Sequence, residues 1–454
     1  MFQLRSYQTE TIDKITASIQ AGHNSIIVQQ PPRTGKTVIM ADIARRATAK
    51  GNRVLFVVHR KEIVDQVVTT FRDDDVDMSL AKIGMVQTIT RRIERLETPS
   101  IIFVDEAHHA LSKTYRRILD AFPDALKLLF TATPIRLSGE GFTEIADDLI
   151  IGKSIQWLID NHFLAPLDYY APNQLNNEDL KVKRNGEFDE KSIEQAFKPK
   201  VYGNAVATFK RLSLDKQAIA YTYNVASAER LANQFNADGI TAKAVSGHTP
   251  KDERDQIISA YRNGKIQVIT NAELFTEGLD LPNVDTVIML RPTQSLSLYL
   301  QFSMRSVNPR EGKRALIIDH VGNIDRFGPP TANREWTLEG QKKKSRQQSG
   351  PTLAITTCEQ CFAVFERKNL THCPYCGTEL AKPKELEVVD DVKLEKVNLA
   401  KTLAARAKKV MNSNVAGKRP ADLKNYAEVK EYQQLMGYKR GWSYFYAKKR
   451  GFIK

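Results

Sequence analysis

The chain has 454 residues, 42% of them hydrophobic and 26% charged, a composition typical of a globular protein with roughly two to four domains. No apolar run approaches the roughly 18 residues of a membrane span, and the start lacks the basic-then-apolar pattern of a signal peptide, so we expect a soluble intracellular protein. The net charge is +14, of which residues 341–454 carry +13, with 24 Lys and Arg against 11 Asp and Glu. Together with the motifs described below, this basic tail favours nucleic acid as a partner over a tail whose lysines only keep it soluble.

In the first part of the chain, short apolar runs alternate with stretches of helical periodicity. The expected strands lie at residues 25–30, 53–60, 100–107 and 126–133. An amphipathic segment at 37–51 lies between the first and second of these strands, and another at 61–72 lies between the second and third; both are expected to be helices. This alternation predicts a parallel sheet with crossover helices, which we assign to a first α/β domain at residues 1–170.

Residues 171–204 are polar and interrupt the alternation, so we interpret them as a connector. Within them, "KVKRNGEF" predicts a small hairpin on an Asn185-Gly186 turn. The alternation then resumes, with expected strands at residues 217–224, 241–247, 266–271, 284–290 and 314–320. Two helices between them are expected to end at Gly239 and Gly264, since glycine is the usual residue after a helix. A second α/β domain is therefore predicted at residues 205–335.

The rest of the chain divides into three parts. Residues 336–352 form a basic linker, 353–381 a cysteine module, and 382–454 a basic region with helical stretches.

Residues 29–37, "QQPPRTGKT", end like a phosphate-binding loop, although Gln30 stands where the general pattern has a glycine. The strand before the loop and the helix after it supply the N–H groups and the helix N-terminus that face phosphates in such loops. Lys36 is expected to reach the β- and γ-phosphates of ATP, and Thr37 to hold Mg²⁺. The candidate ATP-binding residues of the loop are Thr34, Gly35, Lys36 and Thr37. Alone, "TGKT" is a modest signal, and an ordinary strand-turn-helix is the alternative.

Two adjacent carboxylates, Asp105 and Glu106, follow an apolar run about seventy residues further on. Burying two adjacent carboxylates at the end of a strand costs free energy unless a cation lies beside them. In NTPases with such a pair, the first carboxylate holds Mg²⁺ and the second acts on the attacking water as general base. The loop and the carboxylate pair together predict a site of ATP hydrolysis.

These motifs and several others occur in an order that resembles a superfamily 2 helicase of the DEAH-box type. The resemblance covers most of residues 1–320, including "LRSYQ", "VLFVVHRKEIVDQ", "VQTIT", "DEAH", "TAT", "AIAYTYN", "VITNAELFTEGLDLP" and "LYLQFSMRSVNP". It implies an α/β fold with two tandem RecA-like domains that bind ATP between them. It also implies that Gln8 reads the adenine and that Gly278 and Asp280 lie near the nucleotide. The residues that it implies along the nucleic-acid path are Arg60, Gln87, Thr88, Thr131, Thr133, Asn224 and Thr270.

The last of these segments departs from the family pattern, which is Q-x-x-G-R-x-x-R. Gln301 and Arg305 match, and both are expected to serve catalysis, whereas Met304 replaces the glycine and Asn308 the last arginine. That arginine usually contacts the γ-phosphate. Arg310 is a candidate substitute, and an active ATPase remains the favoured interpretation.

All four cysteines lie in one cluster with the spacing C-x₂-C-x₁₁-C-x₂-C, which resembles a zinc ribbon. Each pair can present two thiolates to one tetrahedral Zn²⁺, and four ligands with no open position predict a structural site. The predicted ligands are Cys358, Cys361, Cys373 and Cys376, with His372 as a bystander.

The last residues mix aromatic side chains with cations. The aromatic residues are Tyr426, Tyr432, Tyr438, Trp442, Tyr444, Phe445 and Tyr446. Such a mixture suits unpaired bases and phosphates. We expect most of these rings to form the core of a small helical unit instead, with its basic surface touching DNA.

The layout resembles RadD-like and phage-encoded helicases of the UvsW type. The resemblance implies an ATP-dependent DNA helicase in replication, recombination or repair, on forked or branched DNA, in the cytoplasm of a bacterial cell or a phage-infected host. Single-strand-binding or replication proteins are expected partners, and membranes are not. The alternatives are an RNA-directed helicase and a nucleic-acid-binding scaffold with weak ATPase activity.

Overall fold

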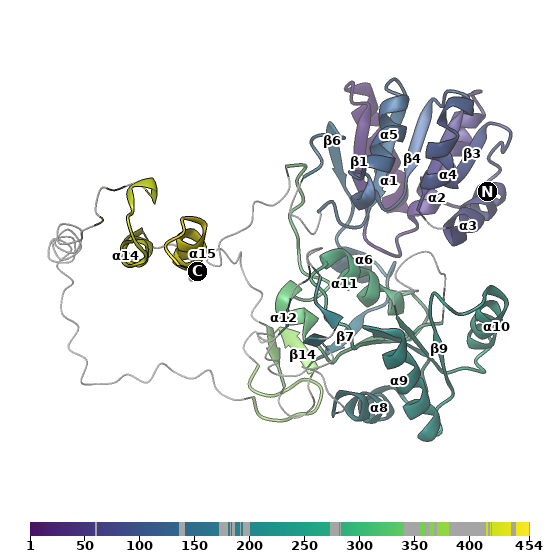
Figure 1. Cartoon of the computed structure of the whole chain (residues 1–454). Coiled ribbons are helices and arrows are strands. Elements are labelled where there is room, and N and C mark those ends of the chain that lie inside the picture. The colour runs from purple at the N-terminus through teal and green to yellow at the C-terminus, as the bar shows by residue number, and fades with distance from the viewer. Residues whose placement is uncertain are drawn as a thin grey trace. The chain divides into compact units, whose positions relative to one another are not determined.

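In the computed structural model of the chain (Figure 1), the residues fall into two compact units, Met1–Leu380 and Ala381–Lys454. The structure describes residues 1–59, 61–135, 141–171, 180–181, 183, 187–190, 192–193, 200–272, 281, 283–339, 355–358, 361, 363–366, 370–380, 415, 418, 420–436 and 442–453. Within these residues, no helix is both long enough and apolar enough to cross a membrane.

The first unit begins with a six-stranded parallel sheet in the order β3-β2-β4-β5-β1-β6. The strands are β1 (Ser25–Gln29), β2 (Val54–Val58), β3 (Ala81–Met85), β4 (Ile101–Val104), β5 (Leu126–Thr131) and β6 (Asp148–Ile151). The helices are α1 (Ser6–Gln20), α2 (Lys36–Thr48), α3 (Lys61–Asp73), α4 (Val86–Arg91) and α5 (Lys113–Ala121), with short 3₁₀ turns η1 (Ile93–Arg95) and η2 (Ala107–His109).

Both faces of this sheet are buried. Ile26 and Val28 of β1 belong to one apolar cluster, which includes residues of α2 and α3. Ile27, between them in sequence, belongs to a second cluster with residues of α4 and α5. Burial on two faces explains why these strands read as continuous apolar runs rather than as an alternating pattern.

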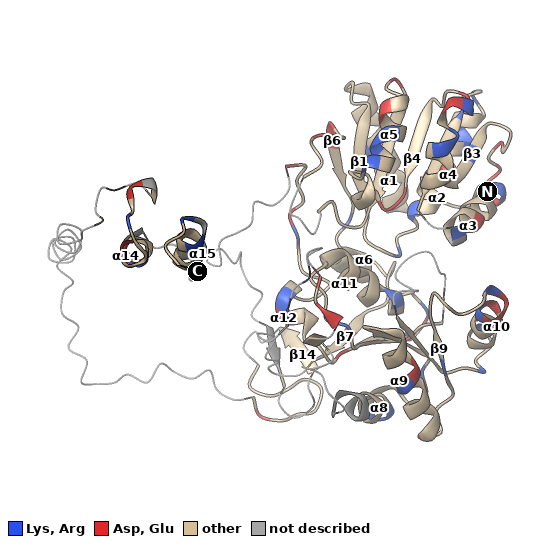
Figure 2. Ribbon diagram, viewed as in Figure 1, with Lys and Arg blue, Asp and Glu red and all other residues tan. Residues whose placement is uncertain are grey.

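A second sheet follows in the same unit, with eight strands in the order β13-β14-β7-β12-β11-β8-β10-β9. Its strands are β7 (Leu167–Tyr170), β8 (Ala218–Thr222), β9 (Ala242–Val245), β10 (Val268–Ala272), β11 (Thr286–Met289), β12 (Ala315–Asp319), β13 (Ile355–Thr357) and β14 (Ala363–Glu366). The six strands from β7 to β12 run parallel, and β14 joins β7 in antiparallel fashion. Figure 2 shows that the strands of both sheets are largely free of charged residues, which lie mainly on helices and loops.

Helices cover this sheet as well. They are α6 (Ile155–Asp160), α8 (Lys200–Ser213), α9 (Val225–Ala237), α10 (Lys251–Arg262), α11 (Leu296–Ser303) and α12 (Asn323–Phe327), and α11 continues into the 3₁₀ turn η5 (Met304–Ser306). One apolar cluster joins the sheet to α8 and α9, and another joins it to α6, α10 and α11. The helices α9 and α10 are followed by Gly239 and Gly264 with φ of 80° and 73°, the left-handed conformation expected of these two glycines.

The structure moves one predicted boundary. The first domain was expected to extend to residue 170, but β7 pairs with β12 of the second sheet, and Ile155 of α6 belongs to the second core. The chain therefore enters the second domain before α6. The strand β7 has only four residues, "LDYY", and both of its partners, β12 and β14, lie far along the chain, so its local pattern carries little signal.

The connector is described only in part. Lys183 N donates to Glu187 O at 2.6 Å, and Asp189 N donates to Lys181 O at 2.7 Å, which is the pairing of the predicted hairpin. The turn at Asn185 and Gly186 lies outside the described residues.

The second unit contains the turn η6 (Pro420–Asp422) and the helices α14 (Tyr426–Met436) and α15 (Trp442–Lys449). Tyr432 is buried in its small core, with Tyr426 and Tyr446 packed against it, whereas Tyr444 is 45% exposed. Three of the four described rings thus belong to a core, while the side chains of Tyr438, Trp442 and Phe445 lie outside the described set.

Candidate active site and metal centre

The loop after β1 ends where α2 begins, at Lys36. Gly35 caps this helix with φ 73° and ψ 42°, a left-handed conformation that glycine adopts without strain. A Cβ at this position would lie 2.7 Å from the Gln8 Nε2 atom. Backbone conformation and packing therefore both require glycine beside Lys36, and a bare backbone is what allows close approach of a phosphate.

Two side chains of α1 hold the loop. Tyr7 Oη and Gln8 Nε2 donate to the same carbonyl, Thr34 O, at 2.9 Å and 3.0 Å. Gln8 Oε1 accepts from Arg5 N at 2.9 Å, and Gln8 is only 3% exposed. The contact of Gln8 with adenine stays a prediction. The structure shows a role that the sequence did not, since the Gln8 amide links the loop at Thr34 to the start of α1 at Arg5.

Gln30, which stands where the general loop pattern has a glycine, is fully buried. Its Nε2 donates to Thr11 Oγ1 at 2.8 Å. A Cβ on Gly152 would lie 2.6 Å from Gln30 Nε2, so the side chain also packs against that glycine. Gln30 therefore anchors the base of the loop to α1.

Asp105 and Glu106 follow β4, which lies beside β5, and β5 lies beside β1. The carboxylates and Lys36 thus lie at the same edge of the sheet, where the carboxyl ends of parallel strands form ligand sites. Glu106 N donates to Asp105 Oδ1 at 2.9 Å, and Glu106 has the left-handed φ of 52°. His108 Nδ1 lies 3.2 Å from Glu106 Oε2, so a protonated imidazole would form an ion pair with the carboxylate predicted to be the general base.

In the second domain, the helix α11 and the turn η5 carry the two candidate catalytic residues Gln301 and Arg305. Gln301 and Arg305 are 7% and 8% exposed. Phe302 stacks on Tyr221 with the ring centroids 3.8 Å apart. Burial raises the pKa of Tyr221, and the charge of Arg305, to which it is hydrogen-bonded, and the charge of Arg33 act in the opposite direction.

Comparison with known proteins identifies both domains. The family described as "Type III restriction enzyme, res subunit" matches residues 1–87 and 75–136, and the "Helicase conserved C-terminal domain" matches residues 204–309. A "51.5 kDa protein" of a Lactococcus phage (isolate 7-9) is 36% identical over 381 residues, which are 82% of this chain and 83% of the relative. The chain belongs to the superfamily 2 helicases. It is accordingly an ATP-dependent helicase.

More distant relatives of this helicase agree with its fold. "DNA 3'-5' translocase XPB2" of Sulfurisphaera tokodaii is 25% identical over 264 residues, and the match spans 49% of this chain and 58% of that protein. A solved structure, "ATP-dependent Type ISP restriction-modification enzyme LlaBIII bound to DNA", superposes with a TM-score of 0.53 at 15% identity, over 70% of this chain and 28% of that one.

The residues that we expected along the nucleic-acid path of this helicase differ in their surroundings. Gln87 and Thr88 are exposed on α4, as a contact requires. The side chains of Thr131, Thr133 and Thr270 are buried, and Thr270 Oγ1 donates to Ala228 O at 2.7 Å. Asn224 caps α9, its side chain accepting from Ser227 N at 2.8 Å.

The structure therefore does not present Thr131, Thr133 and Thr270 at the surface. The Thr131 hydroxyl donates to Thr133 O at 3.2 Å, and the Thr270 hydroxyl links β10 to α9. Arg60, Gly278 and Asp280 lie outside the described residues.

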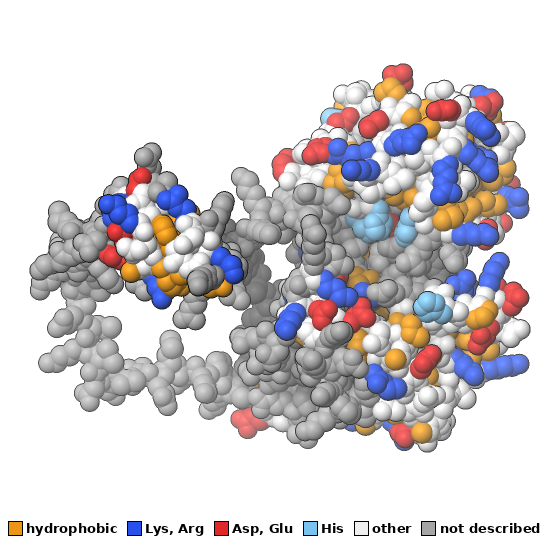
Figure 3. Space-filling view, viewed as in Figure 1, with side chains coloured by type: hydrophobic (Ala, Val, Ile, Leu, Met, Phe, Trp, Pro, Cys, Tyr) orange, Lys and Arg blue, Asp and Glu red, His pale blue; other side chains and the backbone are white. Residues whose placement is uncertain are grey.

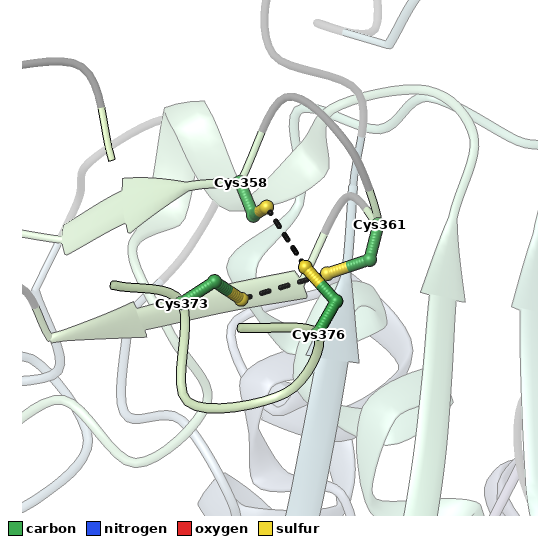
Figure 4. A group of neighbouring side chains, drawn as sticks. All are labelled: Cys358, Cys361, Cys373 and Cys376. Atoms are coloured by element: carbon green, nitrogen blue, oxygen red, sulfur yellow. Dashed lines mark hydrogen bonds between the residues drawn. The ribbon is translucent and has the colours of Figure 1, made fainter. Parts of the chain in front are cut away.

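The four cysteines of the helicase come together (Figure 4). Their sulfurs all lie within 4.8 Å of one another, with Cys358 and Cys376 3.6 Å apart and Cys361 and Cys373 also 3.6 Å apart. Four thiolates around one tetrahedral Zn²⁺, each at about 2.3 Å, would be separated by about 3.8 Å, so the spacing fits this ion. His372 Nδ1 lies 3.0 Å from Thr371 Oγ1 and is not part of the group.

The cysteine module continues the sheet of the second helicase domain. Ala363 and Val364 of β14 pair with Tyr170 and Tyr169 of β7. Next to this pairing, the Asp168 carboxylate accepts two hydrogen bonds from Arg314 Nε, at 2.9 Å and 2.8 Å, and one from Tyr375 Oη at 3.1 Å. The module is therefore fixed to the second domain, an attachment that its cysteine spacing did not reveal.

Proposed function

We propose that this helicase is a DNA helicase or translocase that acts on branched or partly single-stranded DNA in replication, recombination or repair, with fork remodelling or branch migration as its specific task. The observation that carries the proposal is the division of the ATP site. The first domain supplies the loop and the carboxylates, and the second supplies Arg305 from α11 and η5. A site divided in this way couples nucleotide turnover to domain movement.

The residues fit ATP and Mg²⁺ in defined roles. Lys36 and the N–H groups at the start of α2 would bind phosphates, and Thr37 and Asp105 would hold Mg²⁺. Glu106, with His108 beside it, would accept the proton of the attacking water, and Arg305 would stabilise negative charge from the second domain. Mg²⁺, when bound, neutralises charge on the phosphates.

DNA as the substrate is supported by charge and by relatives. The face of the first unit in Figure 3 shows basic and acidic side chains interspersed, in agreement with a net charge near +1 for residues 1–340. The excess of positive charge lies in residues 341–454. Among the similar proteins, XPB2 is a DNA translocase and LlaBIII was solved bound to DNA. A polyanion held through its phosphates would be bound with little sequence preference.

The main test is ATP turnover with single-stranded DNA, with RNA of the same sequence and without nucleic acid. Stimulation by DNA supports the proposal. Stimulation by RNA alone would favour the RNA-directed alternative, and no stimulation by either would contradict helicase action. Lys36→Ala and Glu106→Gln should each abolish turnover, because the first removes the phosphate contact and the second removes the general base. Lys14→Ala, which removes an exposed lysine of α1, is the matched control.

The task in the cell is tested by the choice of DNA. Unwinding of a fork, a partial duplex and a four-way junction should be compared at equal concentration. Preference for the fork or the junction supports remodelling, whereas equal activity on a partial duplex would restrict the proposal to simple unwinding.

A scaffold with weak ATPase activity is the second candidate, favoured by Asn308 in place of an arginine. It predicts tight DNA binding with turnover that does not respond to DNA. Removing residues 381–454 tests the role of the second unit, because the loss of basic residues should weaken DNA binding and reduce its salt dependence.

The cysteine group is proposed to hold one structural Zn²⁺. Metal analysis of the purified chain should find one zinc per molecule, and Cys373→Ser should reduce this value. A chain without zinc that keeps the fold of residues 355–380 would contradict the assignment.

A further inference from the structure

Two residues at the ATP site depart from the family pattern, and they lie in different domains. Asn308 replaces the last arginine of the segment that contains Arg305, and Arg33 occupies a loop position where the family often has a glycine. Arg33 has φ 68°, so its backbone has the left-handed conformation that glycine favours. A residue with a side chain is strained in that conformation.

Within the described part of the chain, four residues other than glycine have a positive φ: Arg33, Asp75, Glu106 and His162. Two of them, Arg33 and Glu106, belong to the ATP site. Strained backbone of this kind concentrates at functional sites. The strain at Arg33 is therefore a reason to ask what its side chain contributes.

Arg33 interacts electrostatically with two residues of the second domain. Its charge acts on Tyr221 and on Lys313, and Tyr221 is the buried ring that stacks on Phe302 and hydrogen-bonds with Arg305. Pro31 and Pro32, next to Arg33 in sequence, line a cavity of about 150 Å³ together with Leu300 of α11. The loop that carries Arg33 and the helix that leads to Arg305 thus face each other across this cavity.

Hydrogen bonds from α1 fix the backbone of the loop next to Arg33. The next residue, Thr34, is held at its carbonyl by Tyr7 and Gln8, and Lys36 follows three positions after Arg33. Arg33 therefore belongs to the same anchored loop as Lys36, the residue expected to reach the phosphates.

Arg310, the substitute expected from sequence, is engaged elsewhere. Its Nη2 forms an ion pair with Asp285, at the start of β11. The same carboxylate pairs with Lys313 Nζ at 3.3 Å. Moving Arg310 to the nucleotide would break this pair, so it is a poor replacement for the missing arginine.

We propose that Arg33 provides, from the ATP-binding loop itself, the γ-phosphate contact that Asn308 cannot provide from the second domain. Arg33 and Arg305 then act on the nucleotide from opposite sides. A guanidinium presents its N–H groups in a planar fork that matches phosphate oxygens, which neither asparagine nor a lysine ammonium reproduces. Since Arg33 belongs to the same loop as Lys36, its contact forms before the domains close.

The test removes the side chain and restores the contact from the other domain. In Arg33→Gly the loop keeps its backbone conformation without strain, so the fold should be at least as stable as wild type. We expect kcat to fall by about 100-fold or more, in the range measured for phosphate-contacting arginines, with little change in KM. Adding Asn308→Arg to this variant should restore at least about tenfold of the loss. The kcat of Arg33→Lys should lie between those of wild type and Arg33→Gly. Arg211→Ala, which removes an exposed arginine of α8, is the control.

A binding measurement provides the second readout. In Arg33→Gly, affinity for ADP should change by less than about twofold, whereas affinity for ADP–aluminium fluoride should fall by roughly the factor seen in kcat, because the contact forms on the transferred group. Equal losses for both nucleotides would make Arg33 a structural residue and overturn the proposal. Unchanged affinity for both, or no recovery with Asn308→Arg, would also overturn it.

This inference rests on the proposed roles of Lys36 and Glu106, and the two can fail separately. Turnover that requires Lys36 but not Arg33 would contradict only the role of Arg33. Turnover that survives Lys36→Ala would contradict the assignment of the whole site.

Discussion

Replacing Gly35 with alanine should disturb the ATP-binding loop by two separable effects. The first is conformational, because alanine at φ 73° costs about 1–2 kcal/mol. The second is steric, because the new Cβ would lie 2.7 Å from Gln8 Nε2. Gln8 must then turn away and lose its hydrogen bond to Thr34 O, which is worth about 1 kcal/mol. The expected loss in free energy of unfolding is about 2–3 kcal/mol.

Gly51→Ala isolates the first effect, since Gly51 has φ 79° and nothing lies within 4 Å of the position of its Cβ. Urea denaturation should therefore show that Gly35→Ala costs about 1 kcal/mol more than Gly51→Ala. In the background of Gln8→Ala, which removes the obstructing amide, this difference should vanish. Equal losses for the two glycines, or full additivity of Gln8→Ala and Gly35→Ala, would refute the assignment of Gln8 as the support of the loop.

Three further predictions concern the second domain. Burial raises the pKa of Asp319 from 3.8 to about 6, so the folded state binds this proton more tightly than the unfolded state. The contribution of Asp319 to stability is therefore present below about pH 4 and is lost as the pH rises through about 6. Asp319→Asn should flatten this part of a curve of unfolding free energy against pH. An unchanged slope would contradict the raised pKa of Asp319. Chelation of the metal should increase hydrogen exchange at residues 167–170 but leave residues 101–104 protected, because only the former pair with β14; equal protection before and after chelation would show that the module does not depend on metal. Asp168→Ala should lower the melting temperature slightly, by the loss of about 1 kcal/mol from its partly exposed contacts with Arg314 and Tyr375, and should leave zinc content unchanged; loss of zinc would indicate a direct part in the metal site.

The fold could be predicted largely from sequence because most strands are buried on both faces. All nine expected strands are present, each as a short apolar run such as Val54–Val58. The strands that sequence did not predict are β3, β6, β7, β13 and β14. All five are short, and the first three include exposed, half-exposed or polar residues such as Lys82, Asp148 and Asp168. The pairing of β6 and β7 also depends on strands distant in sequence, which local pattern does not encode.

The ATP site shows the same division between local and distant causes. The positions of Lys36, Asp105 and Glu106 follow from a strand, a turn and a helix that are contiguous in sequence. The support of the loop by Gln8 and Gln30, and the electrostatic interactions of Arg33, depend on contacts with α1 and with the second domain. Sequence revealed that Gln30 and Arg33 depart from the pattern but not what their side chains contact.

The pairing of β14 with β7 has a consequence for synthesis of the chain. The strand β7 ends at Tyr170, and its partner begins at Ala363, nearly two hundred residues later. Until the ribosome has released that partner, β7 exposes an unpaired edge, a surface on which nascent chains can associate. The second sheet is therefore completed at this edge only after the cysteine module has emerged.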